Sequence, residues 1–236
     1  MYSTACNNTN AIVAFLYVKA TKQRTTRMKV PMYPHEHGAR LRLLHRARYS
    51  LDAACGLAYL EKQKCIHREV SARTCLIVHD TVAGNMLVKI GYFGLWRQFA
   101  TEQRLKDAIQ SDSFVVKHLA PECLTSCHFS HKSDVWAFGV LLWEIFSNGA
   151  EPYPNMTNKE ARSGFFCWFF LWKTREKVVK EHYRMLPPER MPTYVQEQMQ
   201  QCWEELPEER SAFKEIAAKL RLWYQGLDHS NTFVPF

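Results

Sequence analysis

The sequence predicts a mainly α-helical domain of the α+β class that contains a small β-hairpin. Three observations lead to this fold class. Apolar residues recur at steps of three and four in residues 41–62, which indicates an amphipathic helix. Residues 134–146 are apolar on almost every side, which is typical of a helix buried in a core. Two short apolar runs, residues 75–78 and 86–90, flank a turn containing Ala83-Gly84-Asn85, and this arrangement favours a hairpin.

Local signals predict the remaining elements. Residues 11–18 form an apolar run that could be one strand and is too short to span a membrane. Gly149 lies just past the central helix and is a plausible cap. Residues 195–205 predict a helix, and a last helix is expected from a cap at Ser211 to Tyr224, stopped by Gly226. Its apolar face would consist of Phe213, Ile216, Ala217, Leu220 and Trp223.

The loops on either side of the hairpin carry the chemistry-bearing motifs. His67-Arg68-Glu69-Val70-Ser71-Ala72-Arg73-Thr74 precedes the first strand, Gly91-Tyr92-Phe93-Gly94 follows the second, and Ala120-Pro121-Glu122 comes later. In this order the motifs resemble the catalytic core of a protein kinase of the tyrosine-specific class, with wording closest to the cytoplasmic Fes/Fer-like kinases. The resemblance extends over residues 40 to 224. It implies the large, C-terminal lobe of the kinase fold, a role in signalling and a cytoplasmic location.

Three positions that carry the chemistry in this family are changed here. Glu69 stands where the family has the Asp that accepts the substrate proton, and the extra methylene moves the carboxylate by about 1 Å, a displacement that can cost about a hundredfold in rate. Thr74 replaces the Asn that holds a second magnesium ion, and Tyr92 replaces the Asp that holds the bridging one. Mg²⁺ prefers hard, charged oxygens, and the tyrosine phenol is neutral near pH 7. The resemblance therefore predicts impaired catalysis with degenerate cofactor-binding positions.

Other motif positions are kept. Asp134 is expected to accept hydrogen bonds from the catalytic-loop backbone, and Glu122 and Arg210 to form the ion pair that anchors the activation segment. Arg73 has two interpretations, a substrate contact or a structural ion pair with Glu69. The activation loop, residues 95–119, contains no tyrosine, so the usual tyrosine autophosphorylation switch is absent. The positions that the resemblance implies to be structural are His67, Arg68, Phe93, Gly94, Glu122, Asp134 and Arg210.

The small lobe of the kinase fold is predicted to be largely missing. No G-x-G-x-x-G loop and no V-A-I-K lysine precede the catalytic stretch, so half of the usual ATP cradle is absent. The predicted organisation is a basic leader or small-lobe remnant over residues 1–39, a kinase-like large lobe over residues 40–226, and a tail over residues 227–236. We expect no cofactor, with ATP and Mg²⁺ only if the lobe is active.

The net charge of +8 is concentrated near the N-terminus. Residues 1–50 hold nine Lys and Arg against one acid, and the remaining chain has 22 of each sign. This leader could contact an acidic partner or, peripherally, an anionic membrane surface, or it could simply be solvated. The segment lacks the aromatic interleaving typical of nucleic-acid binding, so no nucleic-acid partner is expected. Eight cysteines without a secretory signal favour free thiols in a reducing compartment.

Two further features stand outside the family pattern. Residues 163–175 hold six aromatic residues and interrupt a helix-like segment, so they are interpreted as an insert. This insert is either an exposed apolar patch for a partner or membrane, or retained non-coding sequence. Cys123, Cys127, His128 and His131 have a spacing that could bind zinc, but the adjacent Cys127 and His128 point differently in most conformations, and no metal site is predicted.

The sequence thus supports three hypotheses about function. The first is a tyrosine-kinase-like pseudokinase or fragment that acts as a binding scaffold for protein partners. The second is an active non-receptor tyrosine kinase that transfers the ATP γ-phosphate to protein tyrosine with Glu69 as base. The third is a truncated gene product without function.

Overall fold

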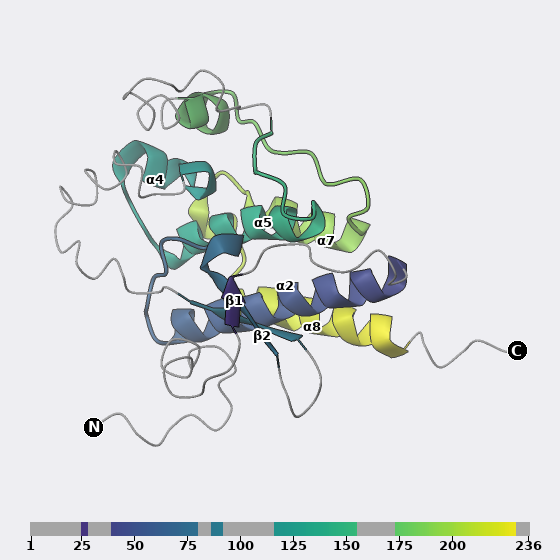
Figure 1. Cartoon of the computed structure of the whole chain (residues 1–236). Coiled ribbons are helices and arrows are strands. Elements are labelled where there is room, and N and C mark those ends of the chain that lie inside the picture. Colours follow the sequence, from purple (N-terminus) through teal and green to yellow (C-terminus); the bar gives the residue numbers. More distant parts are fainter. Residues whose placement is uncertain (1–24, 28–38, 80–85, 92–115, 155–172, 230–236) are drawn as a thin grey trace, which may run out of the picture. The chain divides into compact units, whose positions relative to one another are not determined.

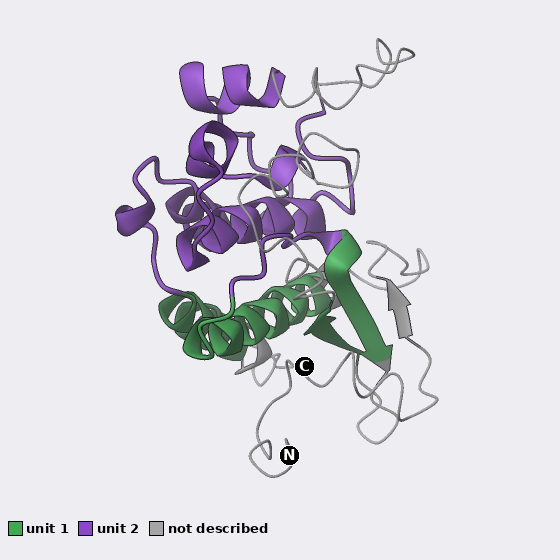
Figure 2. Ribbon diagram, turned by 90° about the vertical axis from the view of Figure 1, so that its left-hand side faces the viewer, with its two compact units in different colours: residues 1–65, 73–92, 213–236 green, residues 66–72, 93–212 purple. Residues whose placement is uncertain are grey.

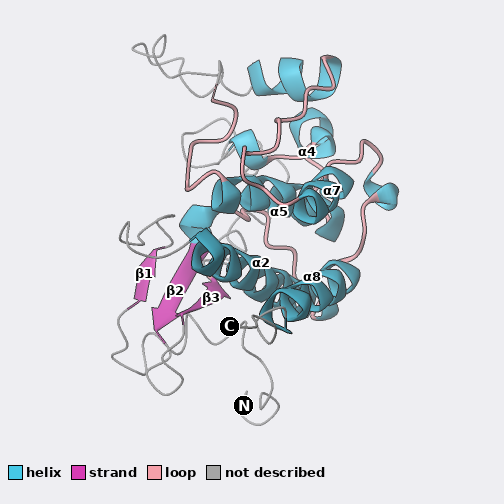
Figure 3. Cartoon of the chain, turned by 90° about the vertical axis from the view of Figure 1, so that its right-hand side faces the viewer, coloured by secondary structure: helices cyan, strands magenta, loops and turns pink. Residues whose placement is uncertain are grey.

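The structure is a computed structural model that describes residues 25–27, 39–79, 86–91, 116–154 and 173–229 (Figure 1). Contacts divide the chain into two compact units (Figure 2). Unit 1 comprises residues 1–65, 73–92 and 213–236, and unit 2 comprises residues 66–72 and 93–212. Helices dominate the described chain, which confirms the mainly α prediction (Figure 3).

Two long helices pack against each other in unit 1. They are α2 (Ala39–Lys62) and α8 (Phe213–His229) (Figure 1). Helix α2 also contacts strand β3 (Met86–Ile90). Its buried residues therefore cover a wider arc of the helix surface than the apolar positions from which the helix was predicted. The predicted face of α8 is confirmed, since four of its five members are buried and Trp223 is half-buried. The helix does not stop at Gly226 as predicted but continues to His229.

The sheet of unit 1 has three antiparallel strands in the order β1-β2-β3 (Figure 3). Strand β2 (Cys75–His79) pairs with β3 in a register that joins Cys75 to Ile90 and His79 to Met86, which confirms the hairpin. Strand β1 (Thr25–Arg27) adds to the other edge of β2 and was not predicted, because three residues are too few to show alternation. The predicted strand at residues 11–18 lies outside the described residues.

A half-buried carboxylate ties the outer edge of this sheet to α2. Asp52 Oδ2 accepts the backbone N–H of Val88 at 3.1 Å, and Asp52 Oδ1 accepts Arg48 Nε at 2.9 Å. Burial raises the pKa of Asp52 above its ordinary value of 3.8, despite the opposing charge of Arg48. The contact satisfies an edge N–H that would otherwise be available to another strand.

Helix α5 (His131–Phe146) is the central helix of unit 2 and is buried along almost its whole length, as predicted. It begins three residues earlier than the apolar run because Ser130 and Ser133 form a capping box, in which each hydroxyl accepts the other residue's backbone N–H. At its other end the N–H of Gly149 bonds the carbonyl of Glu144 at 2.8 Å, and Gly149 adopts φ 73°. This is a Schellman closure in which Asn148, at φ 62°, takes the left-handed position directly after the C-cap and Gly149 supplies the closing N–H.

Unit 2 also contains several shorter helices. Helix α7 (Thr193–Cys202) packs on α5, and Gly139 allows this close approach, since a Cβ there would lie 2.7 Å from Trp203 Nε1. The predicted bounds of this helix, residues 195–205, were displaced toward the C-terminus, because α7 begins directly after Pro192. The other elements of this unit are the 3₁₀ helix η3 (Val116–His118), α4 (Pro121–Ser126), the π-helix η5 (Glu176–Lys180) and the 3₁₀ helix η6 (Pro207–Glu209).

Most of the predicted insert, residues 163–172, lies outside the described residues. Its last residues form a helical turn that leads into η5, and Thr174 and Val178 are fully buried there. The six described cysteines are free thiols. Within the described ranges, no helix combines the length and apolar character needed to cross a bilayer. The domain boundaries at residues 39 and 226 stay predictions, because the leader and the tail lie mostly outside the described chain.

Candidate functional site

The loop that contains Glu69 is held by the first turn of α5. Asp134 Oδ2 accepts the backbone N–H of His67 at 2.7 Å, and Asp134 Oδ1 accepts that of Arg68 at 2.8 Å. Asp134 is only 3 % exposed. A carboxylate that accepts two backbone amides inside a protein makes strong, charge-assisted bonds. The contacts implied by the resemblance are therefore present, and they fix the loop through its main chain.

Local contacts set the next turn of this loop. His67, which is 1 % exposed, accepts the backbone N–H of Glu69 at its Nδ1 atom over 3.2 Å. Arg68 adopts φ 70°, a conformation that costs a non-glycine residue free energy and persists only where its surroundings enforce it. Glu69 is 8 % exposed. The carboxylate-bearing residue at the family's base position thus stands on a fixed backbone.

Thr74 lies in unit 1, at the base of the hairpin. It ends the 3₁₀ helix η1 (Ala72–Thr74) and is 4 % exposed. Its carbonyl accepts the backbone N–H of Gly91 at 2.9 Å, which closes the open end of the hairpin. Tyr92, Phe93 and Gly94 follow directly in sequence and lie outside the described residues. Arg73 is exposed, and its two interpretations both stay open.

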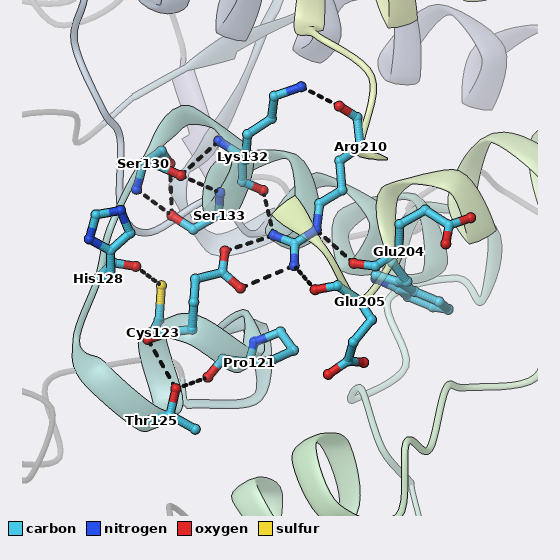
Figure 4. A network of polar contacts seen from close by, with 12 residues as sticks. Pro121, Cys123, Thr125, His128, Ser130, Lys132, Ser133, Glu204, Glu205 and Arg210 are labelled. Atoms are coloured by element: carbon cyan, nitrogen blue, oxygen red, sulfur yellow. Dashed lines mark hydrogen bonds and ion pairs between the residues drawn. The ribbon is translucent and has the colours of Figure 1, made fainter. Parts of the chain in front are cut away.

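The ion pair between Glu122 and Arg210 is present in unit 2 (Figure 4). Arg210 Nη1 and Nη2 donate to the two carboxylate oxygens at 2.7 and 3.0 Å. The remaining N–H groups donate to the carbonyls of Lys132, Glu204 and Glu205. A guanidinium has five N–H donors, and all five are used in this buried position. The arginine is therefore a structural anchor with no donor left for a ligand.

Sequence reasoning missed a second anchor in unit 2. Glu144 Oε2 accepts the backbone N–H of Ala72 at 2.9 Å and also lies 3.1 Å from His118 Nε2. His118 lies in the 3₁₀ helix η3, and the preceding residue of that helix, Lys117, donates from Nζ to Glu151 Oε1 at 2.7 Å. One signal could have revealed Glu144, since it is the only charged residue besides Asp134 in the apolar run 134–146.

The cysteine and histidine cluster after Ala120-Pro121-Glu122 has another use. Cys123 is buried in α4, and its Sγ donates to the carbonyl of His128 at 3.0 Å (Figure 4). Burial, reinforced by the charge of Glu122, raises the pKa of the Cys123 thiol far above its ordinary value. A metal ligand must be a thiolate, so this cysteine is a poor one. Throughout the described ranges, no three His, Cys, Asp or Glu side chains are grouped to hold a metal ion.

Comparison with known proteins identifies the family. Residues 22–220 match the family described as protein tyrosine and serine/threonine kinase. The chain is 39 % identical over 188 residues to Fer-related kinase 1 of Caenorhabditis elegans, which covers 78 % of this chain and 42 % of that protein. It is 38 % identical over 182 residues to tyrosine-protein kinase Fer of Homo sapiens, with 77 % and 20 % covered. It is 40 % identical over 172 residues to megakaryocyte-associated tyrosine-protein kinase of Rattus norvegicus, with 73 % and 32 % covered.

These matches agree with the fold. The mainly helical structure is that of a kinase-like large lobe, as predicted. The chain spans between a fifth and under half of the length of these relatives. This chain belongs to the protein tyrosine and serine/threonine kinase family, in which it has Fer-type tyrosine kinases as relatives.

Proposed function

We propose that this chain is a catalytically impaired, tyrosine-kinase-like large lobe that serves as a binding scaffold for protein partners. One observation carries the proposal. The contacts that build the lobe, from Asp134 to the catalytic-loop backbone and from Glu122 to Arg210, are intact, whereas the positions that would hold magnesium carry Thr74 and Tyr92. The contacts that hold the fold are thus present, whereas the family's metal-binding residues are replaced.

The residues at the cofactor positions do not fit Mg-ATP. Thr74 is buried and offers a single neutral hydroxyl, and Tyr92 is a phenol. Mg²⁺ is held by charged or strongly polar oxygens in octahedral geometry, and two neutral hydroxyls supply little of that. No step of phosphoryl transfer is therefore assigned to this site.

The second candidate is an active tyrosine kinase that uses Glu69 as the base. It is favoured by one observation, that Glu69 retains a carboxylate on a loop whose backbone is fixed by His67 and Asp134. A positioned general base contributes about a hundredfold or more to a rate, but charge stabilisation by the metal is usually a larger contribution. Protein partners, a cytoplasmic location and membrane contact by the basic leader all stay predictions.

A phosphotransfer assay separates the two candidates. The wild-type chain and the Glu69→Ala variant are incubated with radiolabelled ATP, Mg²⁺ and a tyrosine-containing peptide. The scaffold proposal expects no transfer from either protein. Transfer by the wild type that disappears in the variant would overturn it.

A thermal melt of the wild-type chain with and without Mg-ATP completes the test. A cooperative transition that Mg-ATP does not shift supports a nucleotide-free scaffold, because a ligand that binds the native state raises the melting temperature. A shift produced by Mg-ATP would show that the nucleotide site survives. The absence of any cooperative transition would favour a chain that does not fold as a working protein.

A further inference from the structure

Glu144 joins two loops of unit 2 through a single oxygen atom. Its Oε2 accepts the backbone N–H of Ala72, in the catalytic loop, at 2.9 Å. The same oxygen lies 3.1 Å from Nε2 of His118, in the segment just before Ala120-Pro121-Glu122. An ionised carboxylate can only accept, so His118 Nε2 is the donor. The two loops are otherwise separated by more than forty residues of chain.

The burial of this pair makes its contacts strong. The side chain of His118 is 5 % exposed and that of Glu144 is 12 % exposed. A buried carboxylate that loses one donor is left under-solvated, because water does not readily replace the lost bond. The neighbouring Lys117 does not substitute for His118, since its ammonium group bonds Glu151. The carboxylate therefore depends on the two donors that it shares between the loops.

We propose that His118 and Glu144 are positioning residues that couple the segment before Ala120-Pro121-Glu122 to the catalytic loop at Ala72. In this arrangement His118 fixes the position of the Glu144 carboxylate, so a displacement of η3 leaves that carboxylate free to move away from the Ala72 amide. This inference rests on the proposed function, because it names the contacts by which the lobe holds the loop that carries Glu69.

The test measures amide hydrogen exchange at Ala72 by NMR, in the full chain. His118→Leu removes the donor while keeping an apolar side chain in the buried position. It is expected to accelerate exchange at Ala72 about tenfold, because a Glu144 carboxylate without its second donor is held less firmly against this amide. The amide of Leu124, which bonds the carbonyl of Ala120 within α4, is the internal control and is expected to stay unchanged. His118→Gln keeps a side-chain N–H donor and is expected to restore most of the protection.

Three outcomes would overturn the proposal. The first is unchanged exchange at Ala72 in His118→Leu, and the second is equal acceleration at Ala72 and Leu124, which would indicate general loosening of the fold. The third outcome is measured on the wild type and applies even if His118→Leu does not fold. An Ala72 amide that exchanges as fast as an unprotected amide would contradict its bond to Glu144. The exchange readout needs no phosphotransfer, so failure of the scaffold proposal and failure of this coupling are distinguishable.

Discussion

Removal of the Glu122 carboxylate is the sharpest test of the proposed anchor of unit 2. In Glu122→Ala the Arg210 guanidinium keeps its three backbone carbonyl acceptors but loses both charge-assisted bonds, at 2.7 and 3.0 Å. The side chain of Arg210 is fully buried and that of Glu122 is 15 % exposed, so solvent screens the pair little. Breaking a buried ion pair by removing one partner costs about 3–5 kcal/mol. Because Arg210 keeps its three bonds to backbone carbonyls, we expect a loss at the lower end of this range, about 3 kcal/mol.

Urea unfolding followed by circular dichroism measures this loss. For a chain of this size, 1 kcal/mol corresponds to about 2–4 °C in melting temperature, so a thermal melt should fall by about 6–12 °C. Glu204→Ala is the matched control, because that residue contacts Arg210 only through its backbone carbonyl and its side chain is exposed. The control is expected to change stability by less than about 0.5 kcal/mol.

A double-mutant cycle with Arg210→Met then isolates the pair. The double variant Glu122→Ala with Arg210→Met is expected to be less destabilised than the sum of the single variants by about 1–3 kcal/mol. A loss below about 1 kcal/mol in Glu122→Ala, or strictly additive single losses, would refute the argument that this ion pair anchors the lobe.

Three further predictions concern other parts of the chain. Gly139→Ala should lower the free energy of unfolding by about 1–3 kcal/mol, because the added Cβ would lie 2.7 Å from an indole nitrogen. Gly226→Ala should raise it by about 0.5–1 kcal/mol, because a Cβ there meets nothing within 4 Å and alanine favours the helix. Urea titrations of both variants test this, and equal effects would contradict it. Burial raises the pKa of Asp52, so the folded state binds this proton more tightly than the unfolded chain, and stability from this site falls as pH rises above 3.8 through the folded pKa. Asp52→Asn should therefore show a smaller loss of stability between pH 4 and pH 7 than the wild type, and an unchanged difference between the two pH values would count against the raised pKa. Thr74→Asn combined with Tyr92→Asp should introduce a Mn²⁺-dependent rise in melting temperature that the wild type lacks, and no rise would show that side-chain replacement alone does not rebuild the metal site.

The parts of the fold with strong local patterning could be predicted from the sequence. The hairpin followed from two β-type runs and a glycine turn, and α5 followed from its uniform apolarity. The start of α5 was missed because its signal is the pair of hydroxyls on Ser130 and Ser133, which the apolar pattern does not contain. Strand β1 has no alternation of its own and exists through pairing with β2, so tertiary context determines it.

The candidate site also contains residues that a sequence motif identifies and contacts that only the folded structure reveals. Asp134, Glu122 and Arg210 could be found because a motif resemblance names their positions, and their partners are present in the structure. The link from His118 through Glu144 to Ala72 depends on three distant segments meeting at one oxygen, which spacing along a chain does not encode. Tyr92 lies outside the described residues, so its effect on metal binding is argued from chemistry alone.

The hold of Asp134 on the catalytic loop has a consequence for how this protein can change. Both bonds go to main-chain amides, those of His67 and Arg68, and main-chain amides are the same whatever side chain the residue carries. The shape of the loop is therefore insulated from the identity of residue 69. A substitution at Glu69 can therefore change the reactive group at this position while both bonds from Asp134 to the loop remain.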